Sequence, residues 1–289
     1  MRKNVIFSVM AALLLGTGVW QWLFAEPDVA SVELPATTDA IERGRYLVAA
    51  GGCISCHKGT EHPASLSGGM ALHSDFGTFH VPNITPDTDT GIGGWTGADF
   101  LRALKHGRRP DGAFYYPAFP YPSYAGMTDQ DALDIGAYLM SQPPVSFRAP
   151  AHELPGWLHR WMLAGWNRLA GLLNPELVQD ADPGVARGAY LARHLGHCGE
   201  CHTPRNVLGI ADLRREFAGG VLPEGDVEAI DAAALSHWSA EEFTLFLSLG
   251  LKPDGEFVGG EMEPVIEHNT SQLTDHDRQA LAAFFLRAR

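Results

Sequence analysis

The chain has 289 residues, with 34 acidic and 21 basic side chains and a formal net charge of −13. This balance excludes nucleic acid as a partner, because phosphate binding requires a basic face. It permits a partner with a basic docking surface, and it equally suits an exported protein that acidity keeps soluble. The length suffices for two domains of ordinary size, and a hydrophobic content of 45% allows sizeable cores.

The N-terminus has the pattern of a targeting segment. Two basic residues precede an uncharged run over residues 5–25. As a helix, this run would measure about 31 Å, which is enough to cross a bilayer core. The end of the run offers a poor cleavage site, so residues 1–25 are predicted to be a membrane anchor, with a removed signal peptide as the alternative. Both interpretations place the rest of the chain outside the cytoplasm. Residues 26–38 are predicted to be a tether.

The first motif of the folded part is Cys-x-x-Cys-His, formed by Cys53, Cys56 and His57. One helical turn places both cysteines on the same side of the backbone. Their sulfurs can then form thioether bonds to the two vinyl groups of one porphyrin, and His57 can ligate the iron. This is the attachment pattern of c-type haem, although one copy alone also fits a zinc half-site or a redox dithiol.

A second copy of the motif decides between these alternatives. Cys198, Cys201 and His202 repeat the spacing, and the two copies use all four cysteines of the chain. The sequence therefore predicts two covalently bound haem c groups, held by these four cysteines.

The motifs lie within an internal repeat. The first copy opens at Arg43-Gly44 and the second at Arg187-Gly188, and the second is one residue longer up to its motif. Each unit is predicted to contain three helices and little strand, with a long irregular stretch that buries its apolar residues against the porphyrin. The matched positions are Thr96 and Ser239 as helix caps, Gly107 and Gly250 as helix stops, and Thr128 and Thr274 as the starts of the closing helices.

The repeat predicts a division of the chain into 39–146 as the first domain, 147–180 as a linker helix and 181–289 as the second domain. The linker is expected to begin near Pro155, which suits a first helical turn. Its tryptophans recur at roughly helical spacing. We expect a helix packed between the two domains, with an amphipathic helix lying on a membrane or a partner as the alternative.

Each iron of an electron carrier needs a second axial ligand, usually methionine or histidine. In the second unit Met262 is the one methionine after the haem motif, and it is predicted to be that ligand. His237 and His268 are the alternatives. In the first unit Met127 is predicted, because it ends a stiff loop rich in aromatic residues and proline. Met70, His73 and His80 remain alternatives to Met127, whereas Met140 sits at the end of the closing helix.

Two further expectations concern the surroundings of the haems. His57 and His202 should each donate their other ring nitrogen to a carbonyl, which fixes the orientation of the ring. Four arginines are either partners of the haem propionates or solvated side chains: Arg43, Arg108, Arg187 and Arg205.

At residues 77–87 (Gly-Thr-Phe-His-Val-Pro-Asn-Ile-Thr-Pro-Asp), 117–121 (Pro-Ala-Phe-Pro-Tyr) and 201–206 (Cys-His-Thr-Pro-Arg-Asn), the sequence resembles the multihaem cytochrome c subunits of membrane-bound alcohol, aldehyde and gluconate dehydrogenases. The resemblance covers about residues 41–286. It implies a mostly α fold with two tandem class I cytochrome c-like helical domains, here after the predicted N-terminal transmembrane helix. It also implies haem attachment at the four cysteines and iron ligation by His57, His202 and Met262. Met127 matches the ligand of part of the family.

The resemblance also implies the role of an electron-transfer subunit that is not itself a catalyst. Electrons would come from a periplasmic dehydrogenase and pass to the respiratory chain, through a quinone, an oxidase or another cytochrome. The expected location is the periplasmic side of the bacterial inner membrane, with the N-terminal helix as anchor. The alternatives are a dihaem enzyme, such as a peroxidase or a thiosulfate-oxidising cytochrome, and a haem-stabilised docking module. Better-known members of the family carry three haems, whereas this chain has motifs for two.

Overall fold

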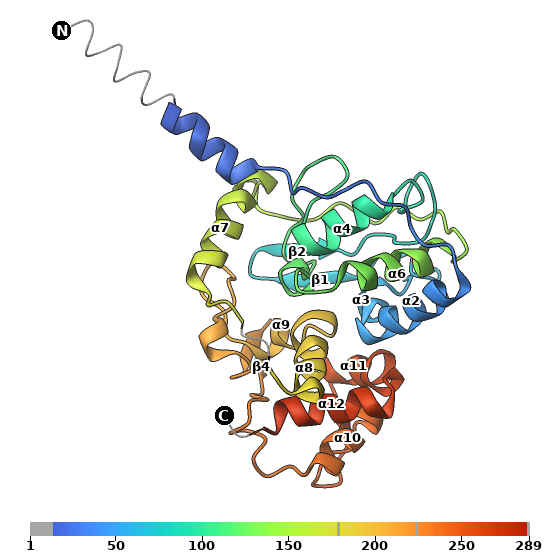
Figure 1. Cartoon of the computed structure of the whole chain (residues 1–289), viewed down its shortest axis with the longest axis vertical. Coiled ribbons are helices and arrows are strands. Elements are labelled where there is room, and N and C mark those ends of the chain that lie inside the picture. The colour runs from blue at the N-terminus through green and yellow to red at the C-terminus, as the bar shows by residue number, and fades with distance from the viewer. Residues whose placement is uncertain (1–13, 178–179, 224, 288–289) are drawn as a thin grey trace, which may run out of the picture.

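The computed structural model describes residues 14–177, 180–223 and 225–287. Helices dominate this part of the chain, and its strands form two short hairpins, which confirms the prediction of little strand. The helices fall into two similar sets, joined by a linker that carries helix α7 (Figure 1).

The elements follow the repeat. The first set comprises α2 (Thr38–Ala50), α3 (Cys53–His57), β1 (Ala71–Ser74), β2 (Gly77–His80), α4 (Gly97–His106), α5 (Tyr121–Tyr124) and α6 (Asp129–Met140). The linker carries η1 (Arg160–Met162) and α7 (Leu163–Leu173). The second set comprises α8 (Pro183–Tyr190), the π-helical turn η2 (Leu191–Leu195), α9 (Gly199–His202), η3 (Leu213–Arg215), β3 (Gly220–Leu222), β4 (Gly225–Val227), α10 (Ala240–Leu249), α11 (Met262–His268), η4 (Thr270–Gln272) and α12 (Asp275–Phe285).

Each hairpin lies in the irregular stretch that follows a haem motif. β1 pairs antiparallel with β2, with Ala71 opposite His80. β3 pairs antiparallel with β4, with Gly220 opposite Val227. The two units therefore have the same order of elements: a first helix, the motif, a hairpin, a second helix and a closing helix.

The predicted helix ends are confirmed. Thr96 and Ser239 each accept a hydrogen bond from the backbone N–H three residues on, and the carboxylate of that residue accepts one from the cap N–H, so both capping boxes are complete. Gly107 and Gly250 end the same helices with φ values of 60° and 72°, a conformation that glycine adopts at little cost.

The first and closing helices of each unit cross at a glycine. A Cβ atom on Gly44 would lie well under 3.0 Å from the carbonyl oxygen of Asp134 in α6. A Cβ atom on Gly188 would do the same at the carbonyl oxygen of Ala280 in α12. The absence of a side chain at these two positions therefore sets how closely α2 packs on α6 and α8 on α12.

The two units share one apolar core. A single cluster of buried side chains runs from Leu47 in α2 and Met127 before α6 to Leu195 in η2 and Leu281 in α12. The boundary between the units is thus itself packed with apolar side chains.

The linker contacts both units. Leu163 of α7 packs in a small cluster with Phe114 of the first unit. The indole Nε1 of Trp166 donates a hydrogen bond to the carbonyl oxygen of Leu208 in the second unit at 2.8 Å.

The predicted start of the linker helix at Pro155 is wrong. The chain makes a turn there, in which the Leu158 N–H donates to the Pro155 carbonyl at 2.9 Å. The helical segment begins at η1 and continues as α7.

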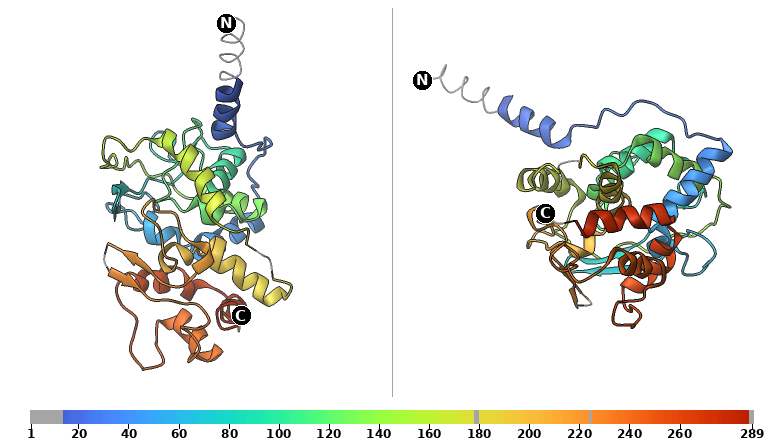
Figure 2. Two further views of the ribbon diagram at one scale, coloured as in Figure 1. Left: turned by 90° about the vertical axis from the view of Figure 1, so that its left-hand side faces the viewer. Right: turned by 60° about the horizontal axis from the view of Figure 1, so that its bottom comes forward.

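The predicted tether is packed against the first unit. Leu34 lies against Gly136 of α6. Directly before the tether, the carbonyl of Ala25 accepts a hydrogen bond from Arg108 at 3.2 Å. Figure 2 shows the N-terminal helix projecting from the first unit and the following chain running across it.

The structure contradicts one part of the predicted fold, the N-terminal transmembrane helix. Within residues 14–177, 180–223 and 225–287, no helix combines the length and the apolar character that crossing a bilayer requires. The start of the predicted segment, residues 1–13, lies outside the described residues.

Candidate haem-binding sites

Both motifs begin directly after a residue in the left-handed region. Gly52 precedes the first motif with φ 64°, and His197 precedes the second with φ 41°. A side chain at such a position is strained. The His197 ring is held in place by donating from Nε2 to the Gly51 carbonyl at 3.2 Å and by an edge contact with the Tyr124 ring at 5.5 Å.

The motif histidines are oriented by backbone carbonyls, as predicted. The Nδ1–H of His57 donates to the carbonyl oxygen of Pro82 at 2.9 Å, and the Nδ1–H of His202 donates to that of Glu228 at 2.8 Å. A carbonyl can only accept, so Nε2 of each ring keeps its lone pair, which is the form that binds a metal. Burial lowers the pKa of His57 to about 4, so this ring is neutral at neutral pH.

The motif cysteines are four unpaired thiols. Burial raises the pKa of Cys53 and of Cys198 to about 12. A redox dithiol works through a thiolate of lowered pKa, so these thiols lack its main property. No group of three or more His, Cys, Asp or Glu side chains suited to a metal ion occurs in the part of the chain that the structure describes. Among the described residues, neither motif therefore has the further ligands that a zinc site would need.

The two motifs lie near each other at the boundary between the units. His197, which directly precedes Cys198, donates to the carbonyl of Gly51, two residues before Cys53. Burial raises the pKa of Cys201 to about 11, and the nearby carboxylate of Glu200 acts in the same direction. In addition, α11 of the second unit packs against α3, the helical turn of the first motif. Two redox groups held by these motifs would therefore be neighbours.

Met127 is buried near the end of the loop that precedes α6. It is 2% exposed, and its N–H donates to the carbonyl oxygen of Tyr124 at 2.9 Å. Met127 and Tyr124 belong to one buried cluster, and Cys53 of the first motif packs against that cluster. The loop that ends at Met127 and the first motif therefore share one core.

Met262 lies on the side of the second motif. It is the first residue of α11 and is partly buried. Its neighbour Glu261 is one of the charges that act on Cys201. Of the alternatives, His237 is exposed, and His268 lies at the end of α11, next to the carboxylate of Glu267 at 3.7 Å.

The three residues predicted as alternatives to Met127 are either exposed or in contact with other polar side chains. Met70 is 37% exposed. His73 lies in β1, and its Nδ1 is 3.2 Å from the hydroxyl of Thr78. His80 lies in β2, with Nε2 3.4 Å from a carboxylate oxygen of Glu153.

The four candidate propionate partners all have partners within the protein. Arg43 pairs with Asp134 at 2.6 Å, Arg187 with Asp277 at 2.7 Å, Arg205 with Glu200, and Arg108 donates to the carbonyls of Gly112 and Ala25. None of the four is simply a solvated side chain.

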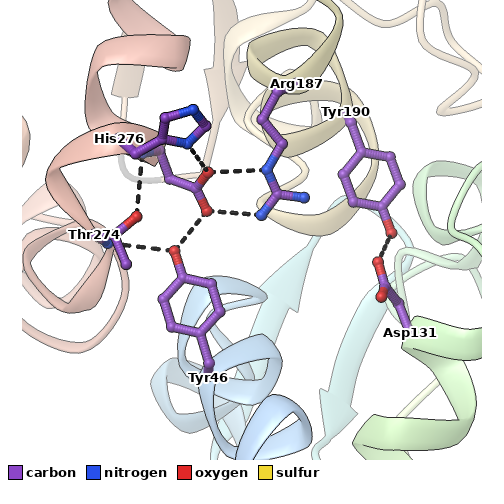
Figure 3. A network of polar contacts seen from close by, with 7 residues as sticks. Tyr46, Asp131, Arg187, Tyr190, Thr274 and His276 are labelled. Atoms are coloured by element: carbon purple, nitrogen blue, oxygen red, sulfur yellow. Dashed lines mark hydrogen bonds and ion pairs between the residues drawn. The ribbon is translucent and has the colours of Figure 1, made fainter. Parts of the chain in front are cut away.

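Sequence reasoning missed a pair of reciprocal contacts between the units (Figure 3). The hydroxyl of Tyr46 in the first unit donates to Asp277 in the second at 2.6 Å, and the hydroxyl of Tyr190 in the second donates to Asp131 in the first. The repeat carried the signal, since both tyrosines stand three residues after the opening arginine and both aspartates three residues after the capping threonine.

The residues present fit a covalently held haem. Each site combines two thiols one helical turn apart, a neutral histidine with Nε2 available, and a later methionine near the motif. This donor set, on paired helical units, defines a c-type cytochrome.

Comparison with known proteins agrees with this class. The profile of the family described as cytochrome c matches residues 41–143. A dihaem c-type cytochrome of Cereibacter sphaeroides is 44% identical, over 99% of this chain and 98% of its own length. The chain belongs to this family of dihaem c-type cytochromes. It is an electron-transfer cytochrome that carries two covalently bound haem c groups, and it is not itself an enzyme.

Other relatives are subunits of larger enzymes. The gluconate 2-dehydrogenase cytochrome c subunit of Pantoea cypripedii and the cytochrome c subunit of the quinone-dependent alcohol dehydrogenase of Gluconobacter oxydans are each 35% identical, over 84% of this chain. The chain spans 58% and 54% of their respective lengths.

Proposed function

We propose that this protein carries electrons from a dehydrogenase subunit to the respiratory chain on the periplasmic side of the bacterial inner membrane. The observation that carries the proposal is the juxtaposition of two complete motifs at one boundary, where His197 beside Cys198 donates to the carbonyl of Gly51 and α11 packs against α3. The relatives named as cytochrome subunits of dehydrogenases support a dehydrogenase as the donor. The acceptor is a quinone, an oxidase or another cytochrome.

The proposal assigns one haem to each unit, residues 39–146 and residues 181–289, joined by the linker 147–180. Cys53 and Cys56 hold one porphyrin and Cys198 and Cys201 the other. When bound, each haem supplies a one-electron iron couple. The chain supplies the ligands and the surroundings that set its potential.

His57 and His202 are the proximal ligands in this proposal. The hydrogen bonds from their Nδ1 atoms to backbone carbonyls fix both tautomers and leave the Nε2 lone pair of each ring for the iron. Met127 and Met262 are the distal ligands. A thioether sulfur is neutral and soft, so it favours the reduced iron and raises the potential, and it closes the site to other molecules.

Burial supports Met127 over its alternatives. Met127 is buried in the core against which Cys53 packs, whereas Met70 is exposed and His73 and His80 contact other side chains. Tyr124, also buried there, helps to exclude water from the first site.

The proposal is tested on the mature protein by mass and by spectroscopy. The mass should show two added haems, and the ferric protein should show the methionine-to-iron charge-transfer band. Met127→Leu and Met262→Leu should each remove about half of that band, because each removes one of two equivalent ligands, while the haem content stays at two. Met70→Leu is the matched control and should leave the band unchanged. If Met70→Leu removed half of the band and Met127→Leu none, the ligand assignment would be wrong.

The donor is tested separately. Membranes of the source organism should yield the chain together with a dehydrogenase subunit, identified by mass, and that dehydrogenase with its substrate should reduce both haems. If a purified dehydrogenase partner left both haems oxidised, the electron donor proposed here would be wrong.

A further inference from the structure

The second unit contains one residue more than the first between its opening arginine and its haem motif. In the first unit this segment is the regular helix α2, which ends at Ala50. In the second unit α8 ends at Tyr190, and the π-helical turn η2 follows it. A π-helical turn accommodates one inserted residue in a helix, and such turns are frequent at functional sites. The extra residue is therefore placed in η2.

The turn directs His194 towards the first unit. Nδ1 of His194 lies 3.0 Å from the carbonyl oxygen of Ser123, so the ring donates to it. The ring also fills the space beside Gly126, where a Cβ atom would lie well under 3.0 Å from three of its atoms. Thus η2 packs on α5 and on the residues that follow it.

Those residues form the loop that ends at Met127. The carbonyl of Ser123 accepts from His194, and the side chain of Ser123 donates to Glu200 at 2.5 Å. Glu200 stands between Cys198 and Cys201 in the second motif and is paired with Arg205. The loop that ends at Met127 is therefore held to the second unit by hydrogen bonds of both the backbone and the side chain of Ser123.

We propose that His194 is a positioning residue for Met127, so that the second unit maintains the axial ligation of the first haem. This inference rests on the proposed ligation by Met127. A methionine sulfur binds iron through one neutral atom, so the rigidity of the loop that carries it decides how fully the bond forms. The hydrogen bond to Ser123 and the fit against Gly126 supply that rigidity from outside the first unit.

Two variants disrupt the contact between the His194 ring and Gly126, one at each of the two residues. His194→Ala removes the ring, and Gly126→Ala displaces it, since the backbone of Gly126 has no positive φ and its new methyl group would meet the ring. Both variants should lose part of the methionine-to-iron band, up to the half that belongs to one haem. One haem per chain should bind carbon monoxide when reduced, and the potential of that haem alone should fall.

Two variants separate positioning from folding. In His194→Ala/Gly126→Ala, the methyl group occupies part of the vacated space, so the band should recover relative to either single variant. His194→Gln keeps a donor for the Ser123 carbonyl and should retain more of the band than His194→Ala. His62→Ala, an exposed histidine of the first unit, is the matched control and should behave as the wild type. Haem content by mass should remain two throughout.

The outcomes distinguish this inference from the proposed function. If Met127→Leu removes half of the band but His194→Ala and Gly126→Ala both keep the whole band, the potentials and inertness to carbon monoxide, then positioning by His194 is wrong and ligation by Met127 stands. If Met127→Leu itself keeps the whole band, both are wrong.

Discussion

In each unit, one glycine determines how closely the first helix and the closing helix approach each other. Gly44 and Gly188 stand at the crossings of the first and closing helices, where a methyl group would overlap a backbone carbonyl. Backbone cannot move aside as the end of a long side chain can. The helix crossing must therefore shift if either glycine is replaced.

We expect Gly188→Ala to lower the free energy of unfolding by about 1–3 kcal/mol, because overpacking a closed contact forces the helices apart. Denaturant unfolding of the haem-loaded protein measures this. Gly165→Ala is the matched control, since Gly165 also lies in a helix but has nothing within 4 Å of its Cβ position. That change should raise stability by about 0.5–1 kcal/mol. Equal effects at the two positions would contradict the role given to the crossing.

A second residue-scale prediction concerns acid stability. Burial alone would raise the pKa of Asp277, but hydrogen bonds from Arg187 and Tyr46 outweigh it and hold the pKa below its ordinary value of 3.8. A carboxyl group with a lowered pKa stabilises the fold above its unfolded pKa, and this contribution is lost as the pH falls through the folded value. Asp277→Asn should therefore cost about 2 kcal/mol at pH 7 and progressively less below about pH 4.

Unfolding by denaturant at a series of pH values from neutral to acid measures this difference. Asp75→Asn, at an exposed position in the first hairpin, is the control and should show little effect at any pH. A cost for Asp277→Asn that stayed constant down to the lowest pH would show that its charge does not contribute in the way described.

At the scale of helices and strands, the sequence predicts those features that depend on contacts within a few residues. Thr96, Ser239, Gly107 and Gly250 cap helices through contacts within a few residues, and all four predictions are confirmed. The hairpins were not predicted because their strands are only three or four residues long and depend on the chain around them. The linker helix was predicted with a start that is too early, because proline at position 155 suits a turn as well as a helix.

For the haem-binding sites too, the sequence predicts what depends on local spacing but not the contacts between distant residues. The cysteine and histidine positions follow from spacing alone, and the bonds of His57 and His202 to carbonyls follow from the chemistry of a ligating imidazole. The repeat comparison showed one extra residue in the second unit but not that a π-helical turn would absorb it. The contact of His194 with Ser123 joins positions 71 residues apart, and local patterns carry no information about it.

At the scale of the whole molecule, the two units behave as one packed body. Their buried side chains form one continuous cluster, and reciprocal tyrosine–aspartate hydrogen bonds close the boundary on both sides. Each tyrosine hydroxyl also accepts the N–H of a capping threonine, Thr274 at 3.3 Å and Thr128 at 3.4 Å. Unfolding one unit would therefore expose apolar surface of the other.

We expect Tyr46→Phe and Tyr190→Phe each to lower the free energy of unfolding by about 1–2 kcal/mol, since each removes one hydrogen bond to a carboxylate and the acceptor of a threonine N–H. Far-UV circular dichroism and haem absorbance should still report one shared transition. Tyr138→Phe is the control, because no hydrogen bond of its hydroxyl is found among the described residues. Two separate transitions in the wild type would contradict the shared core, and tyrosine variants indistinguishable from Tyr138→Phe would contradict the closing role of the hydroxyls.

The reciprocal contacts have a further consequence. Tyr46 meets Asp277 as Tyr190 meets Asp131, so each unit uses the same patch of surface to bind the other. This is the self-complementary arrangement found in two-fold symmetric homodimers, here contained within one polypeptide. The extra residue absorbed by η2 is a place where the two halves depart from this internal symmetry.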